Sequence, residues 1–231
     1  MGAPAAELLR RRLVPSATIA TSRVTLPARL AAAGRRRAGR RGRLEMFFAF
    51  DDPCSAVAVI DLVGKTQGRA VELLMLPVLR RGIRGDPAVE LKRAYAVTDA
   101  RRLARRLAME LSRTEPLPPD STAFLAEWVA AHRQPSPGLS AFCARAMRNL
   151  WFQSDGPPSR SALESIWHDE LGTAPPAGRQ AAAVRWDEAR MGRRGPYETP
   201  AVWVAGRWYF AQDRPGPIME YLDLLGWGEA A

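Results

Sequence analysis

The segment 51–55 (Asp-Asp-Pro-Cys-Ser) contains the residues of this chain that are best suited to chemistry. It follows the apolar run 44–50 and precedes the apolar stretch 56–63, which has helical character. We therefore expect the segment to lie where a strand ends and a helix begins. The first backbone N–H groups of a helix are unpaired, and the helix dipole favours negative charge there, so a thiol or hydroxyl at this point can be reactive.

Asp52, Cys54 and Ser55 are the candidate catalytic residues. Asp52 is also a candidate N-cap, with Pro53 at the first helical position. An ionised Asp52 can only accept hydrogen bonds and would repel a thiolate. The Cys54 thiol could react and form a mixed disulfide with a small thiol, or it could be an inert small side chain. Cys143 lies in an apolar helical stretch, so we expect it in the core.

The elements that position these residues follow from hydrophobic periodicity and from turn residues. The predicted elements are, in chain order, strand 44–50, helix 54–65, strand 70–76, a loop at 82–87, helices 90–111, 122–132, 138–153, 159–171 and 181–192, strand 201–205, a turn at Gly206-Arg207, strand 208–211 and helix 215–225. Strands thus flank a helical block of about a hundred residues, far longer than a usual connection. A β-α-β half and a β-β-α half separated by helices predict an α/β protein with a thioredoxin-like fold and an inserted helical domain.

Five short motifs occur in one order along the chain. They are Phe-Ala-Phe-Asp-Asp-Pro-Cys-Ser at 48–55, Leu-Pro-Val-Leu at 76–79 with Lys-Arg-Ala-Tyr at 92–95, Arg-Asn-Leu-Trp at 148–151, Thr-Pro-Ala-Val at 199–202 and Phe-Ala-Gln-Asp-Arg at 210–214. Together they resemble the kappa-class glutathione transferases and 2-hydroxychromene-2-carboxylate isomerases, within the DsbA-like thioredoxin superfamily. The resemblance covers roughly residues 44–227. It implies glutathione as cofactor, a hydrophobic aromatic small-molecule substrate and a possible homodimer.

The resemblance also implies roles for residues far from the segment 51–55. Thr199-Pro200 resembles the cis-proline of the fold, where the backbone of Thr199 would pair with the cysteinyl part of glutathione. The alternative for Pro200 is an ordinary proline at a strand start. Gln212 and Asp213 resemble the segment that opens the last helix, where Asp213 would receive the glutamyl ammonium of glutathione. The alternative is that Asp213 only caps this helix.

Pro53, Lys92 and Tyr95 are the candidate substrate-binding residues. Lys92, Tyr95, Asp99 and Arg102 share one broad helix face by spacings of three and four. They could line a substrate cleft or form salt bridges on the surface. The two histidines of the chain fall in different predicted helices without a suitable ligand spacing, so we expect no metal site.

Three functions remain open on the sequence. The first is a glutathione-dependent isomerase or transferase, in which the thiol adds to an unsaturated substrate and is eliminated after bond rotation. The family has Ser or Cys where this chain has Asp52, and Tyr or His where it has Cys54, which puts the chemistry in question. The second is a monothiol oxidoreductase at Cys54, because the Cys-x-x-Cys pair of a dithiol cycle is missing. The third is a non-catalytic thioredoxin-fold binding protein.

The net positive charge of the chain is accounted for by residues 1–43. They hold eleven Arg and one Glu, a balance of 11 − 1 = +10, which equals the formal net charge of +10 for the whole chain.

We expect residues 1–43 to be a basic, flexible extension and 44–227 to be the thioredoxin-like domain, with the helical insertion at about 88–195. The extension could be a flexible or partly helical bacterial tail, an organelle transit peptide or an arm that binds anionic lipid or nucleic acid. We therefore expect a cytoplasmic protein of bacterial type, or an organellar one if the extension is a transit peptide. No apolar run is long enough to predict a transmembrane segment.

Overall fold

The computed structural model describes residues 25–80, 86–118, 120–153, 156–195 and 198–228 of the chain. The elements are α2 (Leu26–Arg37), β1 (Gly42–Phe48), α3 (Pro53–Thr66), β2 (Val71–Pro77), α4 (Val89–Arg106), α5 (Ala123–Ala131), α6 (Pro137–Arg148), the π-helix η1 (Asn149–Gln153), α7 (Arg160–Leu171), α8 (Ala181–Arg194), β3 (Ala201–Val204), β4 (Arg207–Phe210) and α9 (Pro215–Leu224). Within the described residues, no helix is both long enough and apolar enough to cross a lipid bilayer.

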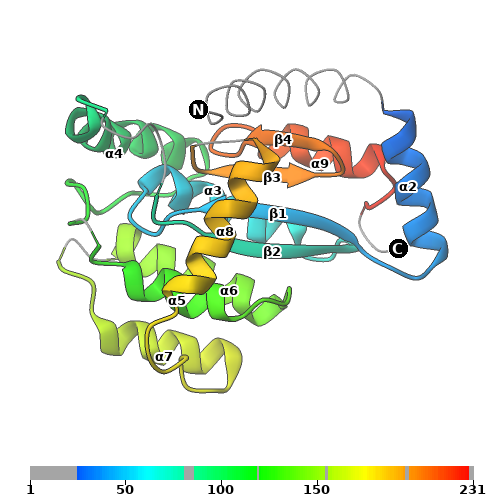
Figure 1. Ribbon diagram of the computed structural model, residues 1–231. Coiled ribbons are helices and arrows are strands. Elements are labelled where there is room, and N and C mark those ends of the chain that lie inside the picture. The colour runs from blue at the N-terminus through cyan, green and yellow to red at the C-terminus, as the bar shows by residue number, and fades with distance from the viewer. Residues whose placement is uncertain (1–24, 81–85, 119, 154–155, 196–197, 229–231) are drawn as a thin grey trace, which may run out of the picture.

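The strands form one sheet in the order β2-β1-β3-β4 (Figure 1). β1 and β2 are parallel and stay in register over seven residue pairs, from Gly42 opposite Val71 to Phe48 opposite Pro77. β3 is antiparallel to β1, and β4 is antiparallel to β3. The β1-α3-β2 unit and the β3-β4-α9 unit therefore meet in a single sheet, as predicted for a thioredoxin-like fold.

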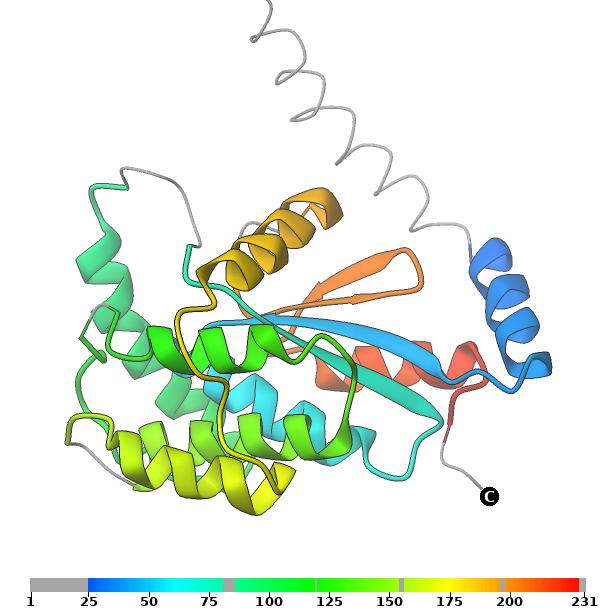
Figure 2. The same ribbon diagram turned by 60° about the horizontal axis from the view of Figure 1, so that its bottom comes forward.

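The two faces of the sheet are covered by different helices, α8 on one face and α3 with α9 on the other (Figures 1 and 2). Leu44, Met46 and Phe48 are buried in the large core that includes α3 and α9. Phe47 points to the opposite face and lies in a smaller buried cluster with Met191 of α8. Since side chains alternate along a strand, the continuous apolar run of β1 supplies both cores, which is typical of a central strand.

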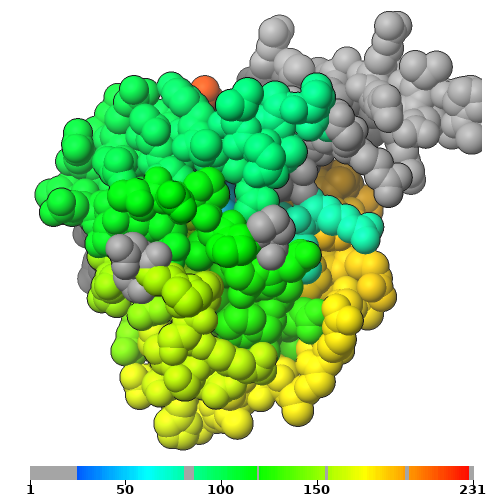
Figure 3. Space-filling view, turned by 90° about the vertical axis from the view of Figure 1, so that its left-hand side faces the viewer, coloured from blue at the N-terminus to red at the C-terminus, as the bar shows by residue number. Residues whose placement is uncertain are grey.

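The helices between β2 and β3 pack beside the sheet and against one another. α6 contacts α3, β2 and α7, and α5 contacts β2 and α8. The buried Trp167 ring of α7 lies edge to face with Phe142 of α6, at 4.8 Å between centroids, and with Trp128 of α5, at 5.9 Å. These three aromatic residues join three helices into one buried cluster. Figure 3 views this side of the molecule, where the segments coloured green to yellow form most of the visible surface.

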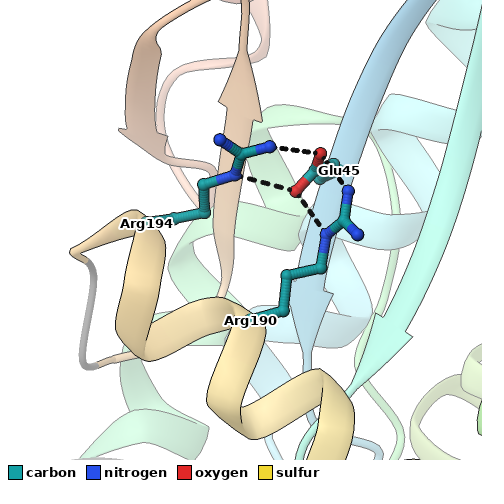
Figure 4. Close-up of polar contacts among 3 residues, drawn as sticks. All are labelled: Glu45, Arg190 and Arg194. Atoms are coloured by element: carbon teal, nitrogen blue, oxygen red, sulfur yellow. Dashed lines mark hydrogen bonds and ion pairs between the residues drawn. The ribbon is translucent and has the colours of Figure 1, made fainter.

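Helix α8 is attached to the sheet by an ion cluster around the buried Glu45 (Figure 4). Glu45 of β1 is buried, and its carboxylate accepts hydrogen bonds of 2.5 and 2.8 Å from Arg190 and of 2.9 and 3.2 Å from Arg194. Burial alone would raise the pKa of Glu45, but the two guanidinium groups outweigh burial and lower the pKa. The Arg194 guanidinium also lies 4.8 Å from the ring centroid of Trp203 on β3. The cluster therefore ties α8 to two neighbouring strands.

The basic extension is helical in its described part, which corresponds to the partly helical alternative. Residues 26–37 form helix α2, and β1 begins at Gly42 rather than at Leu44. The helix is fixed because Ala32 is buried and because the Arg36 guanidinium donates a hydrogen bond to the carbonyl of Leu225 at the end of α9. Residues 1–24 of the predicted extension, and most of the predicted loop 82–87, lie outside the described residues.

Two predicted helices differ from the expectation, one in its end and one in the type of its last turn. The helix predicted over 90–111 ends at Arg106, where Ala108 takes a positive φ of 53°. The chain then turns inward, so that Leu111 is buried and the amides of Ser112 and Arg113 donate to the carbonyl of Trp151. The helix predicted over 138–153 is α-helical only to Arg148, and its last turn is the π-helix η1.

The predicted hairpin turn is displaced by one residue. Its two central residues are Ala205 and Gly206, with φ of 44° and 92°, rather than Gly206 and Arg207. A two-residue turn with positive φ at both positions matches the twist of the paired strands, which is why this register is adopted.

Candidate functional site

The segment 51–55 lies at the junction between β1 and α3, as the sequence predicts. Asp52 has extended backbone angles and is the N-cap of α3, with Pro53 at the first helical position. One carboxylate oxygen of Asp52, Oδ1, accepts the backbone N–H of Cys54 at 3.1 Å. This bond satisfies one of the unpaired amides at the helix start, which explains the Asp-Pro sequence here.

The Asp52 carboxylate also connects α3 to a distant part of the chain. Its second oxygen, Oδ2, accepts the hydroxyls of Ser55 at 2.6 Å and of Thr199 at 3.2 Å, and the side chain is 6% exposed. The Ser55 hydroxyl in turn accepts the backbone N–H of Ala49 at 3.3 Å. The carboxylate is thus held in one orientation between the end of β1, the start of α3 and the segment that precedes β3.

A cleft of about 340 Å³ opens beside this carboxylate. Six of the residues predicted as site residues line it: Asp52, Pro53, Cys54, Lys92, Thr199 and Gln212. They come from α3, from α4 and from the segments before β3 and after β4, which are far apart in the sequence. Apolar residues from other segments complete part of the lining, namely Leu79, Val89, Ala96 and Pro116. The cleft therefore combines polar groups with an apolar surface that suits a hydrophobic ligand.

Cys54 is partly exposed in this cleft, and its thiol contacts the carbonyl of Ala96 on α4 at 3.8 Å. Cys143, the other cysteine of the chain, is fully buried in α6, and burial raises the pKa of its thiol well above the ordinary value. Cys54 is thus the cysteine that a ligand in the cleft could reach.

The peptide bond between Thr199 and Pro200 is cis. Thr199 lines the cleft, whereas Pro200 is buried behind it, and the carbonyl of Pro200 accepts the amide of Ala211 at 2.9 Å. That bond sets Gln212 beside Thr199 at the cleft. The Gln212 side-chain oxygen, Oε1, is buried and has no hydrogen-bond partner among the described residues.

Four of the predicted site residues do not line the cleft: Pro200, which is buried behind Thr199, and Ser55, Asp213 and Tyr95. Ser55 is fully buried and holds Asp52 from behind. Asp213 is half exposed and lies 3.7 Å from the guanidinium of Arg214. Tyr95 is exposed, and its hydroxyl accepts a hydrogen bond of 3.2 Å from Arg102, so these two residues of α4 form a surface contact.

The cleft also includes charged residues that the sequence analysis did not identify: Asp51, Asp86, Arg93 and Glu198. The ammonium group of Lys92 lies 2.5 Å from Asp86, and this hydrogen bond together with the Ala88 amide lowers the pKa of Asp86. Asp51 lies 3.8 Å from the Arg93 guanidinium. Arg93 adjoins Lys92 in the motif 92–95. Its proximity to Asp51 depends on how α4 packs on α3, and the sequence around Arg93 does not indicate it. Among the described residues, no group of His, Cys, Asp or Glu could hold a metal ion.

Comparisons with known proteins agree with this architecture. No protein-family model and no curated protein sequence matches the chain. Among solved structures, a 2-hydroxychromene-2-carboxylate isomerase superposes with a TM-score of 0.59 at 16% identity, covering 80% of this chain and 96% of that one. A probable DsbA oxidoreductase from Streptomyces coelicolor superposes with a TM-score of 0.56 at 13% identity, covering 83% of this chain and 92% of that one.

These two structures are the kinds of protein that the five sequence motifs resemble. The thioredoxin-like fold with an inserted helical block is therefore confirmed. At these identities the similarity concerns the fold, and the activity has to be argued from the site of this chain.

Proposed function

We propose that this chain is a glutathione-dependent isomerase or transferase of the 2-hydroxychromene-2-carboxylate isomerase or kappa type, acting on a hydrophobic aromatic substrate. The observation that carries the proposal is the cleft, where Asp52 and Cys54 at the start of α3 meet Thr199 and Gln212 beside an apolar surface. The isomerase among the structural neighbours is consistent with it.

The lining offers contacts that suit a thiol tripeptide. The backbone of Thr199 would pair with the cysteinyl unit, as the resemblance implies. The unpartnered Oε1 of Gln212 would accept an N–H or ammonium group of the same ligand. Leu79, Val89 and Pro116 would contact the hydrophobic substrate.

In the proposed reaction the glutathione sulfur adds to a conjugated double bond of the substrate. A C–S bond forms and the π electrons move onto the conjugated carbonyl. Rotation about the resulting single bond and elimination of the thiol then give the isomer and return glutathione unchanged. An ionised Asp52 cannot donate a hydrogen bond to a thiolate as a serine would, so its role is to accept the thiol proton during addition and return it during elimination.

A direct test is the isomerisation of a chromene-type or other conjugated aromatic substrate with and without glutathione. Activity should require glutathione and should fall at least tenfold in Asp52→Asn, which keeps the size of the side chain but loses the basic oxygen. Asp52→Ser also loses the proton acceptor, but its hydroxyl can donate a hydrogen bond to the glutathione thiolate, so this variant should retain more activity than Asp52→Asn. Turnover that is independent of glutathione, or that is equal in Asp52→Asn and the wild type, would contradict the proposal.

A second candidate function is monothiol exchange at Cys54, favoured by the position of this thiol in the cleft. The Cys54 thiolate would attack glutathione disulfide, form a Cys54–glutathione disulfide and release one glutathione thiolate. Cys54→Ser separates the two functions. The variant should keep most of the isomerase activity. If the wild type has exchange activity and the variant has lost it, the second function is supported.

A further inference from the structure

Helix α2 is attached to the body of the molecule by one face. Ala28, Ala32 and Arg36 recur every four residues and form this face. Ala32 is buried, Ala28 packs against the main core, and Arg36 donates to the carbonyl of Leu225. Because these contacts fix the rotation of the helix about its axis, they also determine which side chains face away from the body.

The opposite face exposes two large apolar side chains. Leu26 is 62% exposed and Leu30 is 65% exposed, and their spacing of four residues places them one turn apart on the same side. Arg37 is exposed too and lies three turns after Leu26, on that side of the helix.

The segment around these leucines is strongly basic. Residues 25–44 contain seven Arg and no acidic residue. Arg29, Arg37 and Arg40 are exposed. Glu45, the next acidic residue along the chain, is buried and paired with Arg190 and Arg194 of α8. The exposed positive charge of α2 therefore has no acidic neighbour within its own segment.

We propose that α2 docks this protein on an anionic phospholipid surface. A helix with leucines and arginines on one exposed side lies in the membrane interface, with its apolar side chains below the headgroups and its guanidinium groups at the phosphates. Nucleic acid would also attract the arginines, but contacts with its phosphates would leave the two exposed leucines in water. Leu26, Leu30 and Arg37 lie on one exposed face with further arginines beside it, and this combination favours lipid.

The docking surface and the cleft lie at opposite ends of the sheet. α2 precedes the start of β1 at Gly42, whereas the cleft follows its end at Phe48 (Figure 1). Seven strand residues separate the two ends, roughly 20 Å. Docking through α2 would leave the cleft open, so this inference goes beyond the proposed function and does not depend on it.

The test is co-sedimentation of the full chain with vesicles of phosphatidylserine and phosphatidylcholine, compared with vesicles of phosphatidylcholine alone. We expect binding to the anionic vesicles only, with an affinity that falls as salt is raised. The double variant Leu26→Ser/Leu30→Ser should bind about tenfold more weakly or worse. Leu91→Ser is the matched control, since Leu91 is 76% exposed on α4, and it should bind like the wild type.

Other results would overturn the proposal. Failure to sediment with anionic vesicles would do so, as would equal binding by the wild type and the double leucine variant. Salt-sensitive binding to a DNA duplex that survives loss of both leucines, without vesicle binding, would assign the face to nucleic acid. Self-association that disappears in the double variant, without vesicle binding, would assign it to a second copy of this chain. Because Leu26 and Leu30 are exposed, circular dichroism and thermal unfolding should show that the variant is folded.

Discussion

The Asp52 carboxylate joins the start of α3 to the segment before β3. It accepts the Cys54 amide and the hydroxyls of Ser55 and Thr199. A reactive group in a cleft is useful only if it is held in place, and these three donors hold it. The same contacts make Asp52 important for stability as well as for the proposed chemistry.

Replacement of Asp52 should therefore separate its capping role from its other contacts. Asp52→Ala removes the N-cap and leaves the buried Ser55 hydroxyl and the partly exposed Thr199 hydroxyl without this acceptor, so we expect a loss of about 2–3 kcal/mol in the free energy of unfolding. Asp52→Ser retains a capping oxygen and should lose about 1 kcal/mol less. Urea denaturation of both variants measures this, and equal losses would show that the cap does not contribute.

The sequence predicts the part of the site that is local and misses the part that depends on docking. Asp52, Pro53 and Cys54 are adjacent, and the change from an apolar strand to Asp-Pro marks a helix start without further information. Ser55 was also predicted as catalytic. It follows Cys54 directly in α3, and the rotation of the helix from one residue to the next places its side chain on the buried side. Arg93 reaches the cleft only because α4 packs on α3, and this contact between distant segments has no signature in the sequence.

At the scale of the elements, α8 depends on the Glu45 cluster. Glu45→Gln keeps the size of the side chain but removes its charge, and the partly exposed Arg190 and Arg194 can then regain water. We expect a loss of about 2 kcal/mol in the free energy of unfolding near neutral pH. Glu164→Gln, in an exposed pair with Arg160, is the matched control and should change stability by less than about 0.5 kcal/mol.

The pH dependence of this effect has a definite sign. The pKa of Glu45 is lower in the folded protein than its ordinary value of 4.5. Its contribution is therefore present above pH 4.5 and is lost as the pH falls through the folded pKa. The stability difference between wild type and Glu45→Gln should shrink in acid, and a difference that grows below pH 4.5 would contradict this account.

Asp187 on α8 should give the opposite pH dependence. It is buried, one carboxylate oxygen has no hydrogen-bond partner among the described residues, and burial raises its pKa to about 8 despite the charges of Arg133 and Arg190. Between pH 3.8 and about 8 the folded protein then binds one more proton than the unfolded chain, so stability falls as the pH rises.

Asp187→Asn cannot ionise, so it should remove this decline. The free energy of unfolding of the wild type should fall relative to that of the variant by up to about 1.4 kcal/mol per pH unit across this range. Denaturation curves at several pH values measure the difference. Parallel pH profiles for the two proteins would show that Asp187 does not titrate in this way.

Elements with strong local signals were predicted closely. α7 was expected over 159–171 and runs from Arg160 to Leu171, because Ser159 caps its start and Gly172 takes a positive φ at its end. A helix in the basic extension was expected only as one alternative and without bounds, because the Ala- and Arg-rich sequence of α2 has little apolar periodicity. Its position depends on burial of Ala32 and on the contact between Arg36 and the Leu225 carbonyl, which lies at the other end of the chain.

At the scale of the whole molecule, the sheet separates two surfaces of different chemistry. The cleft lies beyond the end of β1, and the exposed basic face of α2 lies before its start. Variants of the two regions should therefore have independent effects. Leu26→Ser/Leu30→Ser should leave glutathione binding unchanged, and cleft variants should leave vesicle binding unchanged.

The measurement that tests the central claim most directly is a titration with glutathione followed by tryptophan fluorescence, because Trp203 and Trp208 lie in the hairpin that follows Thr199. We expect saturable binding that is at least tenfold weaker in Gln212→Ala, since Gln212 lines the cleft. The same titration of Asp213→Ala tests the residue that follows Gln212. The resemblance implies that it weakens binding, whereas the half-exposed position of Asp213 beside Arg214 predicts little effect. No saturable binding to the folded wild type at millimolar glutathione would contradict the assignment of the cleft as a glutathione site.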